Sequence, residues 1–211
     1  MDSRRPVYHT TTDFAMAELP LILASASPRR KELLQEAGIA FETILPDESA
    51  EDDRRLDEPT EEYVRRLAFQ KAKNVADKRE RGIFIGCDTI VLCGGDVLEK
   101  PADRADARRM IRQLRGQVHQ VLSGLCLVMK DASRDTQVLT ETATTQLFMQ
   151  PISDGELETY LDTGIWQGKS GAFGYQDCQN WISILEGSES NVVGLPMGLL
   201  QQMLETMSRY R

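Results

Sequence analysis

Residues 25–30, Ser-Ala-Ser-Pro-Arg-Arg, place two small hydroxyls and two guanidinium groups directly after an apolar run at 21–24. The run predicts a buried strand, and helical apolar spacing over 33–37 predicts a helix after it. Ser27 suits the N-cap of this helix and Pro28 its first turn. Free backbone N–H groups, hydroxyls and arginines at a helix N-terminus form a phosphate site. Solvated arginines are the alternative, but cations there oppose the helix dipole, which favours a bound anion.

Asp88 follows the apolar residues 83–85 and is predicted to end a core strand. That position lies at a sheet edge where ligand sites collect in α/β folds, although many strand-end acids only form turns. Three lysines add to the arginines and supply enough positive charge for a triphosphate: Lys71, Lys100 and Lys169. Carboxylates beside a phosphate site imply Mg²⁺ or Mn²⁺.

The segment 46–58 is strongly acidic. It is either a solvated surface loop or a loop of which one or two carboxylates help to hold a divalent cation. Lys71 lies one turn beyond Leu67 on the apolar face of a helix predicted over 60–78, capped by Thr60. Its side chain either extends outward to water or reaches into a cleft.

Alternating strands and helices position these residues. Strands are predicted at 21–24, 41–45, 82–88, 89–93, 97–98, 118–129, 137–148 and 181–185. Helices are predicted after Ser27, from Thr60, after an Asp103 cap, from a capping box at 153–156, and up to Met207. A turn is predicted at 187–191, and the glycine-rich segment 164–176 resembles a ligand-contacting loop. His119, inside a strand, is predicted to be structural.

The composition is that of a globular protein, with 211 residues, 41% hydrophobic and 27% charged. A net charge of −8 argues against a nucleic-acid polymer or a membrane surface as partner. Four cysteines without a CxxC pair, and only two histidines, argue against zinc and disulfides and favour a cytoplasmic protein. The polar segment 1–20 is predicted to be a flexible extension without a signal peptide.

Six segments, in order along the chain, resemble the Maf family of nucleoside triphosphate pyrophosphatases. They lie at 24–30, 63–72, 87–91, 98–101, 168–176 and 186–196. The resemblance implies an α/β fold, with a mixed twisted sheet flanked by helices and two lobes around a deep cleft, as in inosine triphosphate pyrophosphatases. It also implies one catalytic domain over 21–207 and a homodimer.

The resemblance further implies metal-dependent hydrolysis of a nucleoside triphosphate to its monophosphate and pyrophosphate, with Asp88 as proton acceptor. Arg29, Thr89 and Gln176 match the branch that prefers dTTP and UTP, which also suggests 5-methyl-UTP and a house-cleaning role. The 7-methyl-GTP branch carries an aromatic residue and a glutamine in place of the first two. We hypothesise that the Gln176 amide pairs with uracil O4 and N3–H.

The expected phosphate ligands are Ser25, Ser27, Arg30, Lys71, Lys100 and Lys169. The expected metal ligands are Glu51, Asp52 and Asp88, with Glu48 as an alternative because the acidic loop differs in length from the family pattern. Two other functions stay open. One is a nucleotide-binding regulator of septum formation, and the other is the same chemistry with another base preference, such as 7-methyl-GTP.

Overall fold

A computed structural model of the chain describes residues 19–131, 135–178 and 180–209, and the expected extension at 1–20 lies outside these ranges except for residues 19 and 20. One mixed sheet runs through them in the strand order β2-β1-β3-β5-β6-β7, with β4 paired to β3. Its strands are β1 (Leu21–Leu23), β2 (Glu42–Thr43), β3 (Gly82–Cys93), β4 (Asp96–Leu98), β5 (Val118–Lys130), β6 (Gln137–Met149) and β7 (Ile182–Glu186). β1 is parallel to β2 and β3, and the other pairs are antiparallel.

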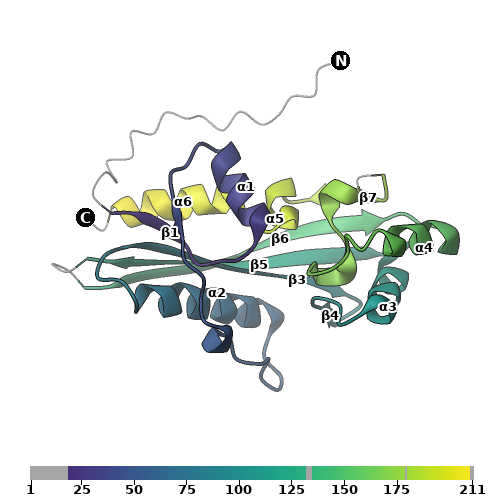
Figure 1. Ribbon diagram of the computed structural model, residues 1–211, viewed down its shortest axis with the longest axis horizontal. Coiled ribbons are helices and arrows are strands. Elements are labelled where there is room, and N and C mark those ends of the chain that lie inside the picture. The colour runs from purple at the N-terminus through teal and green to yellow at the C-terminus, as the bar shows by residue number, and fades with distance from the viewer. Residues whose placement is uncertain (1–18, 132–134, 179, 210–211) are drawn as a thin grey trace, which may run out of the picture.

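Helices cover both faces of this sheet, which confirms the predicted α/β class (Figure 1). They are α1 (Pro28–Glu36), α2 (Thr60–Ala76), α3 (Arg104–Leu114), α4 (Asp154–Asp162), α5 (Glu189–Val193) and α6 (Met197–Ser208), with short 3₁₀ turns η1 (Glu48–Ala50), η2 (Ser170–Ala172) and η3 (Tyr175–Asp177). α2 packs on one face, α1 and α6 pack on the other, and α3 and α4 lie together at one end. None of the helices among the described residues has both the length and the apolar character needed to cross a membrane.

Strand alternation sorts the side chains of β3 between the two helical layers. Ile83, Ile85 and Cys87 are buried in the cluster formed with α6, whereas Phe84 is buried in the cluster formed with α2. Asp88 has the parity of Phe84 and therefore faces α2. Thr89 faces the opposite layer.

Two glycines allow α2 to lie unusually close to the sheet. A Cβ at Gly86 would lie 2.0 Å from the carbonyl oxygen of Ala68, and one at Gly124 would lie 2.1 Å from that of Val64. Real Cβ atoms do not approach other atoms so closely, so no larger residue fits at either position without a shift of the helix. The close contact carries Lys71, on the same helix, to the level of Asp88.

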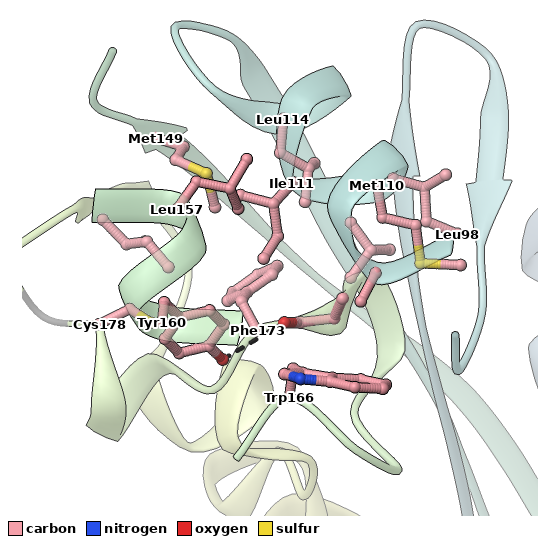
Figure 2. Close-up of a cluster of buried hydrophobic side chains, with 14 of the residues drawn as sticks. Leu98, Met110, Ile111, Leu114, Met149, Leu157, Tyr160, Trp166, Phe173 and Cys178 are labelled. Carbon is pink, nitrogen blue, oxygen red and sulfur yellow. Dashed lines mark hydrogen bonds between the residues drawn. The ribbon is translucent and has the colours of Figure 1, made fainter. Parts of the chain in front are cut away.

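A second core joins α3, α4 and the glycine-rich segment, as Figure 2 shows. Trp166 and Phe173 from that segment are buried among residues of both helices, and the Tyr160 hydroxyl donates to the carbonyl of Ala172 at 3.3 Å. The segment is therefore anchored to the core by its aromatic residues.

Several local predictions are confirmed. The Asp103 side chain caps α3, Ser153 and Glu156 form a capping box on α4, and β5 and β6 form the expected hairpin. His119 is buried with its ring edge-on to Phe173, and burial lowers its pKa to about 4. A structural role is consistent with that environment.

Other local predictions are wrong. Residues 82–93 form one continuous strand rather than two, because the ladder with β5 runs on through Asp88 and Thr89. The expected turn at 187–191 is instead the start of α5, which is capped by Ser188 and continues to Val193, and the strand expected at 41–45 is reduced to β2. Ser27 is the N-cap residue of α1 and Pro28 lies in its first turn, as predicted, although the Ser27 side chain makes no capping hydrogen bond. Thr60 does not cap α2, because it is the first residue of the helix and Pro59 is the N-cap.

Candidate active site

A cleft opens where β3 has no neighbour along one edge. β1 pairs with β3 as far as Ile85, and β4 begins to pair with it at Val91. Asp88 and Thr89 lie between these points. The sequence predicted that Asp88 ends a strand, but it lies in the middle of β3. The cleft has a volume of about 770 Å³.

The cleft brings together all but one of the predicted site residues. Those that line it are Ser25, Ser27, Arg29, Arg30, Glu51, Lys71, Asp88, Thr89, Lys100, Lys169 and Gln176. They come from the β1–α1 turn, the acidic loop, α2, β3, the segment after β4 and the glycine-rich segment. Asp52 is the exception.

Three charged side chains meet on the α2 face of β3. The Lys71 ammonium lies 2.5 Å from Asp88 Oδ1 and 3.0 Å from Glu51 Oε2. The Lys71 and Asp88 side chains are largely buried, at 11% and 15% exposed. The structure therefore settles the alternative left open for Lys71, whose ammonium reaches into the cleft.

The carboxylates of this group fit a divalent cation that arrives with a phosphate ligand. Mg²⁺ is usually held by one or two carboxylates together with phosphate oxygens and water, and Glu51 and Asp88 contact the same nitrogen atom. No cluster of three or more His, Cys, Asp or Glu side chains suited to a metal occurs among the described residues. Asp52 does not join them, because its carboxylate accepts from Gln70 at 2.6 Å and its side chain is 67% exposed.

Hydrogen bonds to neutral groups dominate the opposite face of β3. Arg30 donates to the carbonyl of Gly194 at 2.8 Å, to Ser25 Oγ at 3.0 Å and to Thr89 Oγ1 at 3.3 Å. Thr89 Oγ1 also lies 2.9 Å from Ser123 Oγ. Arg30 is buried, and these bonds fix its guanidinium group in place.

Arg29 contrasts with its neighbour. Its Nε is buried and has no hydrogen-bond partner among the described residues. Burial, and then the charge of Arg30, lower the pKa of Arg29, while Asp177 and Glu32 act in the opposite direction. A bound anion would relieve both the missing hydrogen bond and the repulsion.

The glycine-rich segment closes the cleft from the other side. Ser170 Oγ donates to the carbonyl of Thr89 at 2.8 Å, which joins the segment to β3. Lys169 forms an ion pair with Asp177, and a Cβ at Gly174 would collide with both of these side chains. Gln176 lines the cleft and is exposed.

The chain is similar to known proteins over most of its length. A family model described as Maf-like protein matches residues 20–207. The chain belongs to the Maf family. A dTTP/UTP pyrophosphatase from Rhodopirellula baltica is 40% identical over 93% of this chain and 90% of its own length. A dTTP/UTP pyrophosphatase from Koribacter versatilis is 43% identical over 87% of this chain and 92% of its own length.

A solved nucleoside-triphosphatase / dITP/XTP pyrophosphatase from Mycobacterium abscessus is much more distant from this Maf protein. The two chains are 12% identical with a TM-score of 0.37, over 92% of this chain and 98% of the other. That likeness adds nothing to the family assignment.

Sequence reasoning missed three residues of the site. Gly194 lies inside one of the recognised Maf segments, but a backbone carbonyl that accepts from Arg30, Thr89 and Cys87 leaves no trace in residue type. Ser123 is one small residue within a long apolar strand. Asp177 is the third missed residue, and it forms an ion pair with Lys169. Its position eight residues after Lys169 was the one feature of the sequence that could have indicated this pair.

Proposed function

We propose that this Maf protein hydrolyses dTTP and UTP to the monophosphate and pyrophosphate. The observation that carries the proposal is the group of Lys71, Asp88 and Glu51 at the stretch of β3 where one edge of the strand has no neighbour, inside a cleft that also presents Arg29, Ser27 and Lys100. A triphosphate needs dense positive charge beside the group that accepts a proton from water, and this cleft combines the two. The names of the relatives support the choice of dTTP and UTP.

Asp88 is the proton acceptor in this proposal. Its carboxylate is fixed by Lys71 from one side, so one oxygen is oriented by the ammonium and the other is left for water. Arg29 and Lys100 neutralise the phosphates, because neither has a carboxylate within ion-pair distance among the described residues. Arg30 supports the site indirectly, because its hydrogen bonds fix the hydroxyls of Ser25 and Thr89.

Glu51 and Asp88 would hold the Mg²⁺ or Mn²⁺ ion, with phosphate oxygens and water as its other ligands. When bound, the ion supplies positive charge to the phosphate oxygens. Glu48 also lines the cleft and lies within the acidic loop, so it is placed to interact with the ion through water. Asp52 is left out of this set because of its contact with Gln70.

Base selection is assigned to the glycine-rich side of the cleft. Gln176 offers a donor and an acceptor to the uracil or thymine edge. Thr89 contributes indirectly, since its hydroxyl is engaged with Arg30 and Ser123. A base whose edge does not match leaves the donor or the acceptor of Gln176 unpaired when it enters the cleft.

The test is pyrophosphate release from a panel of nucleoside triphosphates with Mg²⁺ or Mn²⁺. We expect turnover of dTTP and UTP, and of 5-methyl-UTP as a modified substrate, above that of CTP, GTP and 7-methyl-GTP. Gln176→Ala should reduce this preference. Binding without turnover would instead indicate a regulatory module, and preference for 7-methyl-GTP would contradict the branch assignment.

Four further expectations belong to the same proposal. They are a single two-lobed catalytic domain over 21–207, a cytoplasmic location, a house-cleaning role and a homodimer. Sedimentation of the full chain tests the last of these.

A further inference from the structure

The acidic loop carries Glu51 to the cleft, yet most of that loop lies on the surface. Residues 51–57 are exposed and contain no helix or strand. Glu51 itself is held in the cleft by a single ion pair to Lys71. Something outside the cleft must therefore fix the loop if Glu51 is to have one position.

One arginine on α2 supplies that attachment. Arg66 Nε and Nη2 each lie 2.7 Å from an oxygen of Glu58, in a bidentate ion pair. Both side chains are nearly buried, at 12% exposed for Arg66 and 7% for Glu58. The guanidinium also donates to the backbone carbonyls of Asp52, at 3.3 Å, and Asp53, at 3.0 Å.

An aromatic ring supports the same arginine. The Arg66 guanidinium lies 5.4 Å from the centroid of the Tyr63 ring, within the range of a cation–π contact. The Tyr63 hydroxyl donates to Glu99 at 2.7 Å, and Glu99 precedes Lys100 of the cleft. Arg66 is thus fixed both by the loop and by the Tyr63 ring, whose hydroxyl is bonded to the residue before Lys100.

We propose that Arg66 and Glu58 form a clamp that positions Glu51 for the divalent cation. The clamp holds the carbonyls of the two residues that directly follow Glu51, so it fixes the backbone at the point where the carboxylate enters the cleft. Arg66 is a positioning residue and is not among the residues that line the cleft. This inference rests on the proposed metal-dependent function.

The first test uses the loop itself and needs no substrate or metal. Arg54 and Arg55 are exposed trypsin sites between the held carbonyls and Glu58. Arg66→Met should speed cleavage there at least tenfold. Arg65→Met is the matched control, because it removes the neighbouring arginine on the same helix, which forms no ion pair among the described residues. Cleavage at the control rate in Arg66→Met would overturn the clamp.

The second test connects the loop to the cation. Mn²⁺ binding to the protein saturated with a non-hydrolysable UTP analogue, measured by calorimetry, should weaken about tenfold in Arg66→Met. The Mn²⁺ concentration for half-maximal UTP hydrolysis should rise similarly, with most of kcat recovered at saturating Mn²⁺. Faster cleavage with unchanged Mn²⁺ affinity would refute the link to Glu51.

A milder variant covers the case in which Arg66→Met fails to fold. Glu58→Gln keeps the side-chain shape but removes the charge, and it should give the same two effects at a smaller size. Arg66→Lys should not restore the original behaviour, because an ammonium cannot bind both carboxylate oxygens and two carbonyls in this geometry. The trypsin result stands whether or not UTP is the substrate, so failure of the clamp and failure of the proposed function are distinguishable.

Discussion

The two faces of β3 at the floor of the cleft are built from different interactions. On the α2 face, Asp88 contacts Lys71, which also contacts Glu51. On the other face, Thr89 joins Arg30 and Ser123 through hydrogen bonds to neutral groups. On the charged face, a metal ion or a phosphate can replace the present ion-pair partners of these side chains. On the other face, the polar groups already have their hydrogen-bond partners within the protein. Two adjacent residues of one strand therefore have different roles, since Asp88 takes part in the chemistry and Thr89 supports the structure of the site.

The largest expected effect is on the charged face. Lys71→Met removes the cation between Glu51 and Asp88 and should lower kcat/KM for UTP by about 10³-fold, as for other groups that stabilise developing charge. Lys73→Met is the control, because Lys73 lies on the same helix and pairs at the surface with Asp77. Such exposed pairs contribute little, so its activity should stay within about twofold. Activity of Lys71→Met within tenfold of the unaltered protein would remove the distinction between the faces.

The hydrogen-bonded face should respond in stability. Arg30→Met removes a buried charged donor from the Gly194 carbonyl, the Ser25 hydroxyl and the Thr89 hydroxyl, and should lower the free energy of unfolding by about 3 kcal/mol. Arg29→Met removes an unpartnered buried Nε, so it should change the free energy by less than about 1 kcal/mol while still reducing activity. Urea denaturation of both variants measures this difference. Equal losses of stability would show that the two arginines are equivalent.

The packing of α2 against the charged face should give a smaller change when it is disturbed. Gly86→Ala places a Cβ against the backbone of α2 and should cost about 2 kcal/mol of stability, with a displacement of Lys71 that lowers activity. Gly198→Ala in α6 meets nothing within 4 Å and should be neutral or slightly stabilising. Thermal unfolding and UTP turnover check both variants. A stable, fully active Gly86→Ala would show that the close approach of α2 is not needed.

The smallest expected effect is the pH dependence of stability that comes from His119, which does not belong to the charged face. Burial lowers the pKa of His119 to about 4 from an ordinary value of 6.5, so its contribution to stability is complete above pH 6.5 and falls as the pH approaches 4. The free energy of unfolding should drop by about 1 kcal/mol between pH 7 and pH 5.5. His119→Gln should show a flatter dependence over that interval. An unchanged slope would assign the drop to other groups.

Sequence patterns predicted the elements that carry strong local signals. Capping residues such as Asp103 and Ser153 and the alternating hairpin strands all lie where expected. The continuous strand β3 was divided in the prediction because Asp88 and Thr89 are polar. Their burial depends on pairing with β5, which is a long-range interaction that local sequence does not encode.

The same limit applies to the site. Residue type was enough to predict that Arg29, Asp88 and Lys71 belong to one triphosphate site. It could not separate Arg29 from Arg30, since the difference lies in a distant carbonyl at Gly194. It also could not tell Glu51 from Asp52, although the first contacts Lys71 in the cleft and the second contacts Gln70.

The most direct test of the account is pyrophosphate release from UTP by Asp88→Asn, measured together with its unfolding temperature. Asparagine keeps the size of the side chain but cannot accept the proton, so turnover should fall by about 10⁴-fold with little change in unfolding temperature. Turnover near that of the unaltered protein would contradict the assignment of Asp88 as the proton acceptor. It would also contradict the division of roles between the two faces of β3.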